Sequence, residues 1–533
     1  MSEWTLGAVL DAIAEAVPDR VMTACGERRS TFAESAERTR RLANFLAGQG
    51  FGAHREREVL ERWECGQDRV ALIMHNDLYP DAVIGCLKAR VVPVNINHYY
   101  TPREVGELLA YVQPRGVIYH RGLGAKFADV LSQDLMVSID DGSAAPELPG
   151  AATLEDALAQ GDTDQEVTPS PDDVIMICTG GTTGRPKGVL WRQTDMYMVS
   201  MNGADHGSAA EIQAKVRDGG APWYAVSPLM HAAGMWTAFA AIMNGLPVIL
   251  YDSRQKFDPR TVLQTAEREK VGMMTMVGDA YAGPIVEELQ RHSYDLSSLF
   301  AIGTGGAATN PKYQRALLEA IPQITLINGY GSSETGNMAF GHSQRGHEAD
   351  TFQFRDGGLV LSDDYSHFLK PGEPEVGWVA RRGRIPLGYF NDEAATLKTF
   401  PEVEGERVVI SGDRASIEPD GTLRLLGRDS LVVNTGGEKV FVEEVEEVLR
   451  AHPGVEDALV VGRPSERWGE EVVALVAGED ISVQALSDRC NAQLARFKAP
   501  KEFIFVEQIR RLGNGKADYR WAKTVATRQE TLA

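Results

Sequence analysis

The sequence predicts an α/β protein with a large N-terminal body of mostly parallel sheets, a small β-barrel subdomain and a small α+β domain at the C-terminus. Short Val/Ile/Leu runs alternate with longer helical patterns up to about residue 331, as in βαβ units. From about residue 352 short alternating stretches punctuated by Gly, Pro and Asp indicate an antiparallel subdomain or small barrel. A compact βαβ pattern follows Arg428. The expected domains are 1–428, with the β-rich part at about 352–428, and 429–533.

The N-terminal elements follow in order. Residues 1–20, MSEWTLGAVLDAIAEAVPDR, indicate an amphipathic helix whose acids do not suit a signal peptide, so we expect a cytoplasmic protein. Residues 53–65 are expected to form a charged helical surface segment before the first sheet strand. Residues 236–251 are the longest apolar run, and Asn244, Gly245 and Pro247 divide it into a helix and a buried strand, not a membrane span. Apolar strands are expected within the ranges 70–76, 91–97, 116–120, 174–179, 223–229, 271–277, 299–306 and 324–331.

Composition restricts the function. A hydrophobic fraction of 43% with 24% charged residues is typical of a globular chain and excludes a disordered one. The formal charge of −21 argues against nucleic acid or anionic lipid as the main partner, while a local basic pocket for a phosphate ligand stays open. Five scattered cysteines without a CxxC pair indicate reduced thiols and no zinc framework.

A glycine- and threonine-rich run after the strand at 174–179 predicts a phosphate-binding loop. It reads Thr-Gly-Gly-Thr-Thr-Gly-Arg-Pro-Lys and ends at Lys187. Glycines let backbone N–H groups turn toward an anion, threonines add hydroxyl donors and the lysine adds a cation. Lys187 follows Pro186 and precedes Gly188, so the run is not a Walker A loop. The loop residues are Thr179, Gly180, Gly181, Thr182, Thr183, Gly184 and Lys187.

This run is similar to the signature of the adenylate-forming superfamily of acyl-CoA synthetases, luciferases and peptide-synthetase adenylation domains. The other motifs of that superfamily follow in order along nearly the whole chain. They are PLMHAAGM (228–235), IGTGGAA (302–308), GYGSSETG (329–336), SGDRASIEPDGTLRLLGR (411–428), GGEKVFVEEVE (436–446) and GNGK (513–516). The resemblance implies ATP, Mg²⁺ and CoA as ligands, and a C-terminal domain that moves between two half-reactions.

The resemblance also implies a role for each matched residue. Lys516 and Lys187 act on the phosphates, Glu334 with Thr183 holds Mg²⁺, and His231 is a gate beside the carboxylate and the thiol tunnel. Asp413 binds the ribose and Arg428 lies near the sugar or the α-phosphate. Gly436 and Gly437 approach the pantetheine of CoA. The adenine end of the site is expected to comprise Gly305, Gly306, Ala307, Asn328, Gly329, Tyr330, Gly331, Ser332 and Ser333. The family's hinge position is Ser430 here, with Asp429 beside it, and either residue could pivot.

The expected activity is that of an ATP-dependent acyl-CoA synthetase. We expect the acyl pocket to begin at Met235, Trp236, Gly303, Thr304 and Gly305, because methionine adapts its shape and glycine leaves volume. Phrases such as VVPVNINHYY resemble bacterial fatty-acid and sterol-side-chain CoA ligases, which favours a medium-to-long fatty or steroid-derived acid. Loading of a carrier protein, a small or aromatic acid, and a catalytically silent nucleotide-binding protein are the alternatives. The sequence leaves the oligomeric state open, a homodimer included.

Overall fold

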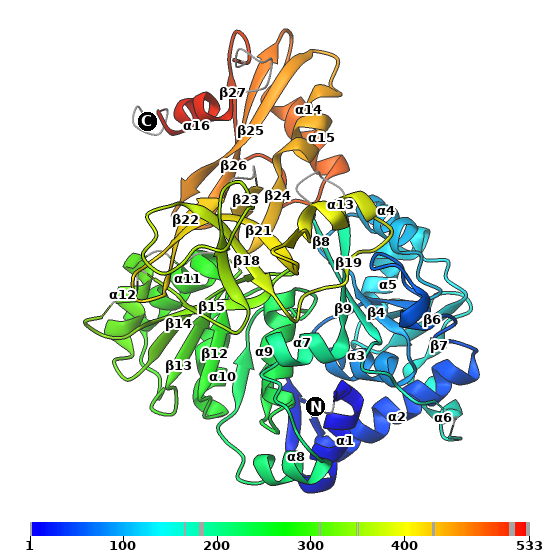
Figure 1. The fold of residues 1–533 in the computed structure, drawn as a ribbon. Helices are drawn as coiled ribbons and strands as arrows, with labels where there is room; N and C mark the ends of the chain where they lie inside the picture. Colours follow the sequence, from blue (N-terminus) through cyan, green and yellow to red (C-terminus); the bar gives the residue numbers. More distant parts are fainter. Residues whose placement is uncertain are drawn as a thin grey trace.

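The computed structural model describes residues 3–164, 167–180, 186–306, 309, 311–347, 349, 351–428, 432–510 and 518–528. A large body carries a smaller C-terminal domain, at the top in Figure 1. Mixed α/β architecture with parallel sheets in the body confirms the expected fold class. Among the described residues, none of the helices combines the length and the apolar character needed to cross a bilayer.

The first of the two large sheets has nine strands, and its central strands run parallel. In spatial order they are β16 (Gln353–Phe354), β15 (Gly336–Ser343), β14 (Thr325–Ser332), β13 (Ala301–Thr304), β12 (Met273–Met276), β10 (Trp223–Ala225), β11 (Val248–Leu250), β1 (Val21–Cys25) and β2 (Arg28–Thr31). The sequence reading missed β1 and β2, because each is short and lies directly beside a helix, where periodicity gives little signal.

The second large sheet has eight strands, six of them in parallel contact from β8 to β7. In spatial order they are β19 (Gly388–Tyr389), β9 (Pro186–Arg192), β8 (Val174–Gly180), β4 (Val92–Asn95), β3 (Arg69–Ile73), β5 (Gly116–His120), β6 (Leu135–Ile139) and β7 (Ala152–Thr153). The short β19 comes from a distant part of the chain and pairs antiparallel with β9. This pairing carries Tyr389 to the phosphate loop.

One apolar core fills the space between the two sheets and involves both of them. Its helices are α1 (Leu6–Ala16), α2 (Phe32–Gly48), α3 (Tyr79–Lys88), α7 (Gln193–Ser200), α8 (Ala209–Val216) and α9 (Ala232–Ile242). A second core packs the outer face of the first sheet against α10 (Pro259–Arg268), α11 (Gly278–Arg291) and α12 (Pro311–Ala320). The outer side of the second sheet carries α4 (Pro102–Val112) and α5 (Arg121–Phe127) with η2 (Ala128–Val130), and α6 (Leu154–Gln160) lies beside α2.

The segment 53–65 is not helical as expected. It is a loop with one 3-10 turn, η1 (Arg57–Val59), and the amides of His54 and Arg55 at its start donate to the Gly66 carbonyl just after its end. Arg90 holds Glu56 through two nitrogens at 2.8 and 2.7 Å and also contacts Asp173. These tertiary contacts replace the helical pairing that its charge pattern indicated.

The β-rich part forms a five-stranded antiparallel sheet. Its strands are β17 (Gly358–Leu361), β18 (Gly377–Arg382), β20 (Glu402–Val403), β21 (Glu406–Ile417) and β22 (Leu423–Arg428), with α13 (Glu393–Thr399) nearby. The C-terminal domain has another five-stranded sheet with helices on both faces. Its elements are β23 (Val432–Thr435), β24 (Glu438–Phe441), α14 (Val442–Arg450), β25 (Val455–Ser465), β26 (Gly469–Gly478), α15 (Val483–Gln493), β27 (Glu502–Phe505) and α16 (Tyr519–Arg528).

Candidate active site

The phosphate loop connects β8 to β9, whose pairing brings Thr179 opposite Lys187 and Gly180 opposite Pro186. The predicted ligands Gly181, Thr182, Thr183 and Gly184 lie outside the described residues. The Lys187 Nζ lies 4.6 Å from the centre of the Tyr389 ring. A cation at this distance over an aromatic face is attracted to it, so the ring restrains the lysine without neutralising its charge.

Tyr389 also connects this lysine to the predicted acid. Its hydroxyl donates a hydrogen bond of 3.1 Å to Oε1 of Glu334. Burial, together with the charge of Glu334, raises the pKa of Tyr389 far above its ordinary value, so the phenol stays protonated and can donate. Sequence reasoning missed Tyr389, because nothing in the short motif around it distinguishes it from a core tyrosine.

The turn that carries Glu334 is fixed from three sides. The Thr335 hydroxyl accepts from the Ser332 amide at 2.8 Å. The Trp191 indole donates to the Ser333 carbonyl at 2.7 Å. The buried guanidinium of Arg381 donates to the carbonyls of Thr335 and Asn337 at 3.1 and 2.8 Å. The acid therefore projects from a rigid loop, as a preorganised ligand or charge requires.

The predicted ribose site brings together residues far apart in the chain. The Tyr330 hydroxyl donates to Oδ2 of Asp413 at 2.6 Å and lies 3.1 Å from the Ser411 hydroxyl. Arg428 on β22 lies opposite Asp413 on β21 in the strand register. At Gly331 a Cβ atom would lie only 2.1 Å from the Gly336 carbonyl oxygen, so this end of β14 requires glycine. Sequence reasoning missed Ser411 as a site residue, and its position two residues before Asp413 on the same strand was the signal that could have indicated it.

The glycine-rich strand end of β13 lies beside β14. The Thr304 hydroxyl donates to Asn328 Oδ1 at 2.8 Å, and Asn328 donates in turn to Gln314. A Cβ atom at Gly305 would lie 3.3 Å from the Gly329 carbonyl oxygen. Gly306 has a φ of +78°, which favours glycine. The structure thus groups the expected adenine-side residues, while Ala307 lies outside the described residues.

The C-terminal domain reaches the body through the β23–β24 hairpin. Gly436 and Gly437 form its two-residue turn, with φ of +60° and +87°. A Cβ atom on Gly437 would lie 2.6 Å from Val277 Cγ1, and one on Gly306 would lie 3.6 Å from the same atom. Val277 therefore separates the adenine-side strand end from the hairpin. This close approach explains the glycine at position 437.

Next to this turn, Glu438 contacts the predicted gate. Its Oε1 lies 2.9 Å from Nε2 of His231, and Asn97 Nδ2 donates to its Oε2 at 3.3 Å. Burial disfavours the charged imidazole, but the charge of Glu438 and its hydrogen bond outweigh that cost and raise the pKa of His231. His231 is the N-cap residue of α9.

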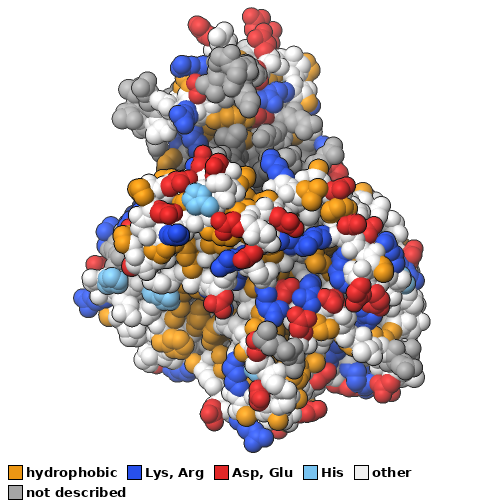
Figure 2. Space-filling model, in the orientation of Figure 1, with side chains coloured by type: hydrophobic (Ala, Val, Ile, Leu, Met, Phe, Trp, Pro, Cys, Tyr) orange, Lys and Arg blue, Asp and Glu red, His pale blue; other side chains and the backbone are white. Residues whose placement is uncertain are grey.

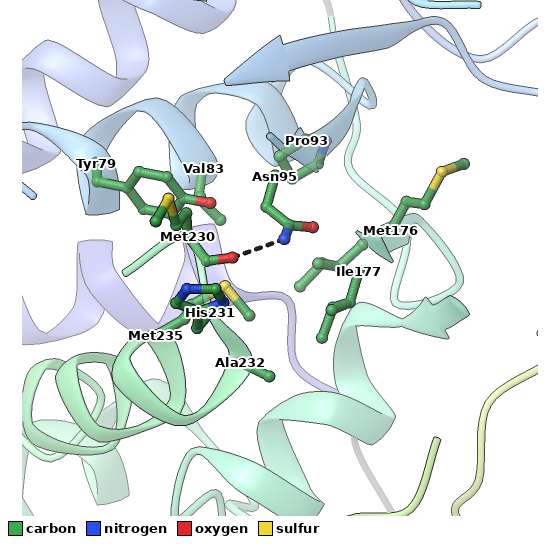
Figure 3. A pocket seen from close by; sticks show the side chains of 11 residues that line it. Tyr79, Val83, Pro93, Asn95, Met176, Ile177, Met230, His231, Ala232 and Met235 are labelled. Atoms are coloured by element: carbon green, nitrogen blue, oxygen red, sulfur yellow. Dashed lines mark hydrogen bonds between the residues drawn. The ribbon is translucent and has the colours of Figure 1, made fainter. Parts of the chain in front are cut away.

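His231 also lines a pocket (Figure 3). Asn95 crosses it and donates to the Met230 carbonyl at 2.6 Å. Its wall is apolar and comes from β4, β8, α3 and the start of α9. The lining residues are Tyr79, Val83, Pro93, Asn95, Ile175, Met176, Ile177, Met230, His231, Ala232 and Met235.

The residues expected to start the acyl pocket do not share this cavity. Met235 lines the pocket of Figure 3, whereas Gly303 faces Thr275 and Met273 of β12. Trp236 is buried in the core between the sheets, with no hydrogen-bond partner for its indole N–H among the described residues. Each residue along a helix is rotated by about 100°, so Ala233 and Met235, two positions apart, point to nearly opposite sides of α9. It is Ala233 that lies near Gly306.

A different surface lies next to Gly305: one face of the first sheet across β12, β13 and β14, here named the apolar trough. Strand register aligns Met273, Ala301 and Thr325 in one row and Thr275, Gly303 and Ile327 in the next. The alternate residues of these three strands are buried under α10–α12. Among the described side chains, the core between the sheets includes β10 and β11 but none of β12–β14. The trough is thus a sheet face with small residues along its middle strand.

The described part of the chain has no cluster of three His, Cys, Asp or Glu side chains that would hold a metal ion. Lys516 and the hinge candidates Asp429 and Ser430 lie outside the described residues. For Arg428 the structure describes the backbone only. The outer surface in Figure 2 mixes acidic and basic side chains. Of the three cations predicted near the phosphates, Lys187, Arg428 and Lys516, the structure describes the side-chain surroundings of Lys187.

Comparison with known proteins gives matches along the whole chain. The family model "AMP-binding enzyme" matches residues 10–362, and "AMP-binding enzyme C-terminal domain" matches 444–516. The medium-chain acyl-CoA ligase Mig of Mycobacterium avium is 42% identical over 98% of both chains. A 3-oxocholest-4-en-26-oate–CoA ligase of Rhodococcus rhodochrous is 35% identical over 95% of this chain and 93% of its own.

A solved structure supports the fold. The amide bond synthetase McbA of Marinactinospora thermotolerans superposes with a TM-score of 0.78 at 22% identity, covering 97% of this chain and 99% of its own. At that identity the similarity concerns the fold alone.

Proposed function

The chain belongs to the AMP-binding enzyme family and, within it, to the acyl-CoA ligases, and on that premise we propose that it activates a bulky apolar carboxylic acid. The acid attacks the α-phosphate of ATP to form an acyl adenylate and pyrophosphate. The thiol of CoA then displaces AMP to form the thioester. The single observation that carries the substrate class is the apolar trough beside Gly305.

In the first half-reaction, we assign the polar residues of the body to the binding of ATP. Lys187 and the loop before it bind phosphate oxygens, and Asp413 binds the ribose hydroxyls with Arg428 near the sugar. Tyr330 and Gly305 border the adenine. Lys516, assigned by motif alone, stabilises charge that develops as two anions meet. Rigid placement of Glu334 and Lys187 through Tyr389 supports these assignments.

The donor set suits Mg²⁺. Glu334 supplies a carboxylate oxygen and Thr183, by motif, a hydroxyl, which fits an ion that usually takes one or two protein oxygens and completes its shell with phosphates and water. When bound, the ion neutralises part of the phosphate charge. Glu334 itself keeps its position through the Tyr389 hydroxyl.

The second half-reaction uses the C-terminal domain in the orientation seen here. We propose that 1–428 is the nucleotide-binding body and 429–533 the cap. The Gly436–Gly437 turn lies against Val277, and we assign it to the pantetheine of CoA by motif. By motif we assign His231, with Glu438 bound to it at 2.9 Å, to the border of the thiol path.

The trough favours large acids. The middle strand of this sheet face carries only the small residues Ala301 and Gly303, which suits a long chain or fused rings, and the outer strands supply apolar contact through Met273 and Ile327. The named activities of the two relatives, on medium-chain acids and on a cholestenoate, agree with this size. We therefore propose a medium-to-long fatty acid or a steroid side-chain acid as substrate.

The test is thioester formation across acids of graded length and ring content, with mass spectrometry of the product. We expect CoA thioesters with medium, long or steroid acids and far slower turnover with acetate and benzoate. Activity that persists without CoA when a carrier protein is supplied would instead indicate carrier loading. Preference for acetate or an amino acid would overturn the proposed substrate class.

A further inference from the structure

A buried group of charges at the start of α4 connects the two domains. Lys498 of the C-terminal domain is 7% exposed in its side chain, and Glu104 of the body is 9% exposed. The ammonium donates to Oε1 of Glu104 at 2.8 Å. It also donates to both oxygens of Glu444 at 2.9 and 3.0 Å.

Glu104 is held in place by its own helix. It is the third residue of α4, and its Oε2 accepts from the Thr101 amide at 2.8 Å and the Thr101 hydroxyl at 2.9 Å in a capping box. One carboxylate oxygen thus stabilises the helix start, and the other points at Lys498. The acceptor is preorganised before the domains meet, so little side-chain freedom is lost on contact.

The other contacts of Lys498 involve both domains. Glu444 lies on α14 beside it, and Tyr100 of the body covers it, with Nζ 4.8 Å from the ring centre. Phe497 stacks on Tyr100 at 6.4 Å between ring centres. When the domains separate, Lys498 keeps Glu444 but loses Glu104 and the Tyr100 face. The ion pair between Lys498 and Glu104 therefore requires the contact between the domains that is seen here.

We propose that Glu104 is a positioning residue for thioester formation: by binding Lys498 it holds the C-terminal domain in the orientation in which Gly436, Gly437 and Glu438 reach the body. Its role rests on the proposed two-step function. Burial costs Lys498 its hydration, but the two carboxylates outweigh that cost and raise its pKa, so the group stays an ammonium. Breaking one partner of such a buried group leaves charge uncompensated and favours the separated orientation.

The test uses the whole enzyme with Glu104→Gln. A glutamine at this position still serves the capping box, so α4 keeps its start while the charge that faces Lys498 is lost. The matched control is Glu34→Gln. Glu34 occupies the same capping-box position on α2, where its Oε2 accepts from the Thr31 amide at 2.8 Å, and it lies exposed on the body.

Two half-reactions are measured separately for each variant, together with the thermal midpoint. We expect Glu104→Gln to slow thioester formation from supplied acyl adenylate by about tenfold at saturating CoA, while pyrophosphate exchange stays within about twofold. Glu34→Gln changes neither. Lys498→Gln slows the same step at least as much, and adding Glu104→Gln to it costs little more, because both changes remove one contact.

A cysteine pair reports the domain orientation without turnover. Arg103 Nη1 lies 3.2 Å from Gln493 Oε1 across the same interface, so Arg103→Cys with Gln493→Cys can be joined by a short bismaleimide. We expect a lower cross-linking yield with Glu104→Gln than with Glu34→Gln. Equal yields and equal loss of both half-reactions at an unchanged thermal midpoint would overturn the positioning role. Absence of pyrophosphate exchange in the unmodified enzyme with every acid would instead refute the proposed function.

Discussion

The hydroxyl of Tyr389 donates a 3.1 Å hydrogen bond to Glu334, the acid predicted to hold magnesium. The two residues come from different sheets, since β19 joins β9 while Glu334 follows β14. The tyrosine ring also lies under Lys187. One side chain thus positions the acid and the cation that are assigned to the phosphates of ATP.

Tyr389→Phe separates the two contacts, because phenylalanine keeps the ring beneath Lys187 and loses the hydroxyl. We expect pyrophosphate exchange to fall about three- to tenfold, with a stability loss of about 1 kcal/mol. Tyr294→Phe is the control, since its hydroxyl also donates to a glutamate, Glu288, on α11. Equal exchange rates in the two variants would show that the hydroxyl does not position Glu334.

Lys516→Ala tests the division of labour between the half-reactions. We expect pyrophosphate exchange to fall by about 10² to 10³, as for loss of one charge-stabilising donor, while thioester formation from supplied acyl adenylate survives. Lys523→Ala, on the exposed side of α16, should leave both rates unchanged. Equal loss of both half-reactions in Lys516→Ala would contradict the assignment.

Asp413→Asn tests the ribose site. The amide keeps the shape but weakens acceptance from ribose hydroxyls and from Tyr330, so we expect KM for ATP to rise about tenfold with a smaller change in kcat. Asp420→Asn, in the turn before β22, is the control for local stability of this sheet. A KM for ATP that does not move would remove Asp413 from the site.

Gly303→Val tests the trough as the acyl surface. A Cβ atom here would already lie 3.0 Å from Thr275 Cγ2, and two further methyl groups would narrow the middle of the trough. We expect kcat/KM for long-chain and steroid acids to fall at least about tenfold, and that for a short acid to change little. Gly48→Ala, where a methyl group meets nothing within 4 Å, controls for general effects. A uniform loss across all acids would argue against the trough.

His231 provides a pH test of the domain contact. Its pKa is raised above the ordinary 6.5 by Glu438 in spite of burial. The contact between them is therefore fully present at acid pH and is lost as pH rises through the raised value. In Glu438→Gln only burial and the charge of Lys439 remain, and both lower the pKa of His231, so we expect it to fall below 6.5, measured by NMR of the imidazole protons. A pKa that stays raised would mean that another group, not Glu438, stabilises the charge.

Local motifs determined what the sequence could show about this protein. Some functions need particular residue types within a few positions of the chain, and such short motifs can be recognised in the sequence alone. Examples are the loop at 179–187, the glycine pair at 436–437 and the acid at 334. Helix starts such as Thr101 with Glu104 are likewise local. The α/β class, the antiparallel part and the motif order followed from the same kind of signal.

Tertiary structure alone decided which distant residues meet. Tyr389 reaches Glu334 through a two-residue strand, Lys498 reaches Glu104 across the domain interface, and the trough exists because parallel strands align their small residues in register. It also separated Met235 from Gly303 and left residues 53–65 without a helix. The physical reason is that these contacts depend on how sheets and domains pack, an energy summed over many residues, which no short stretch of sequence encodes.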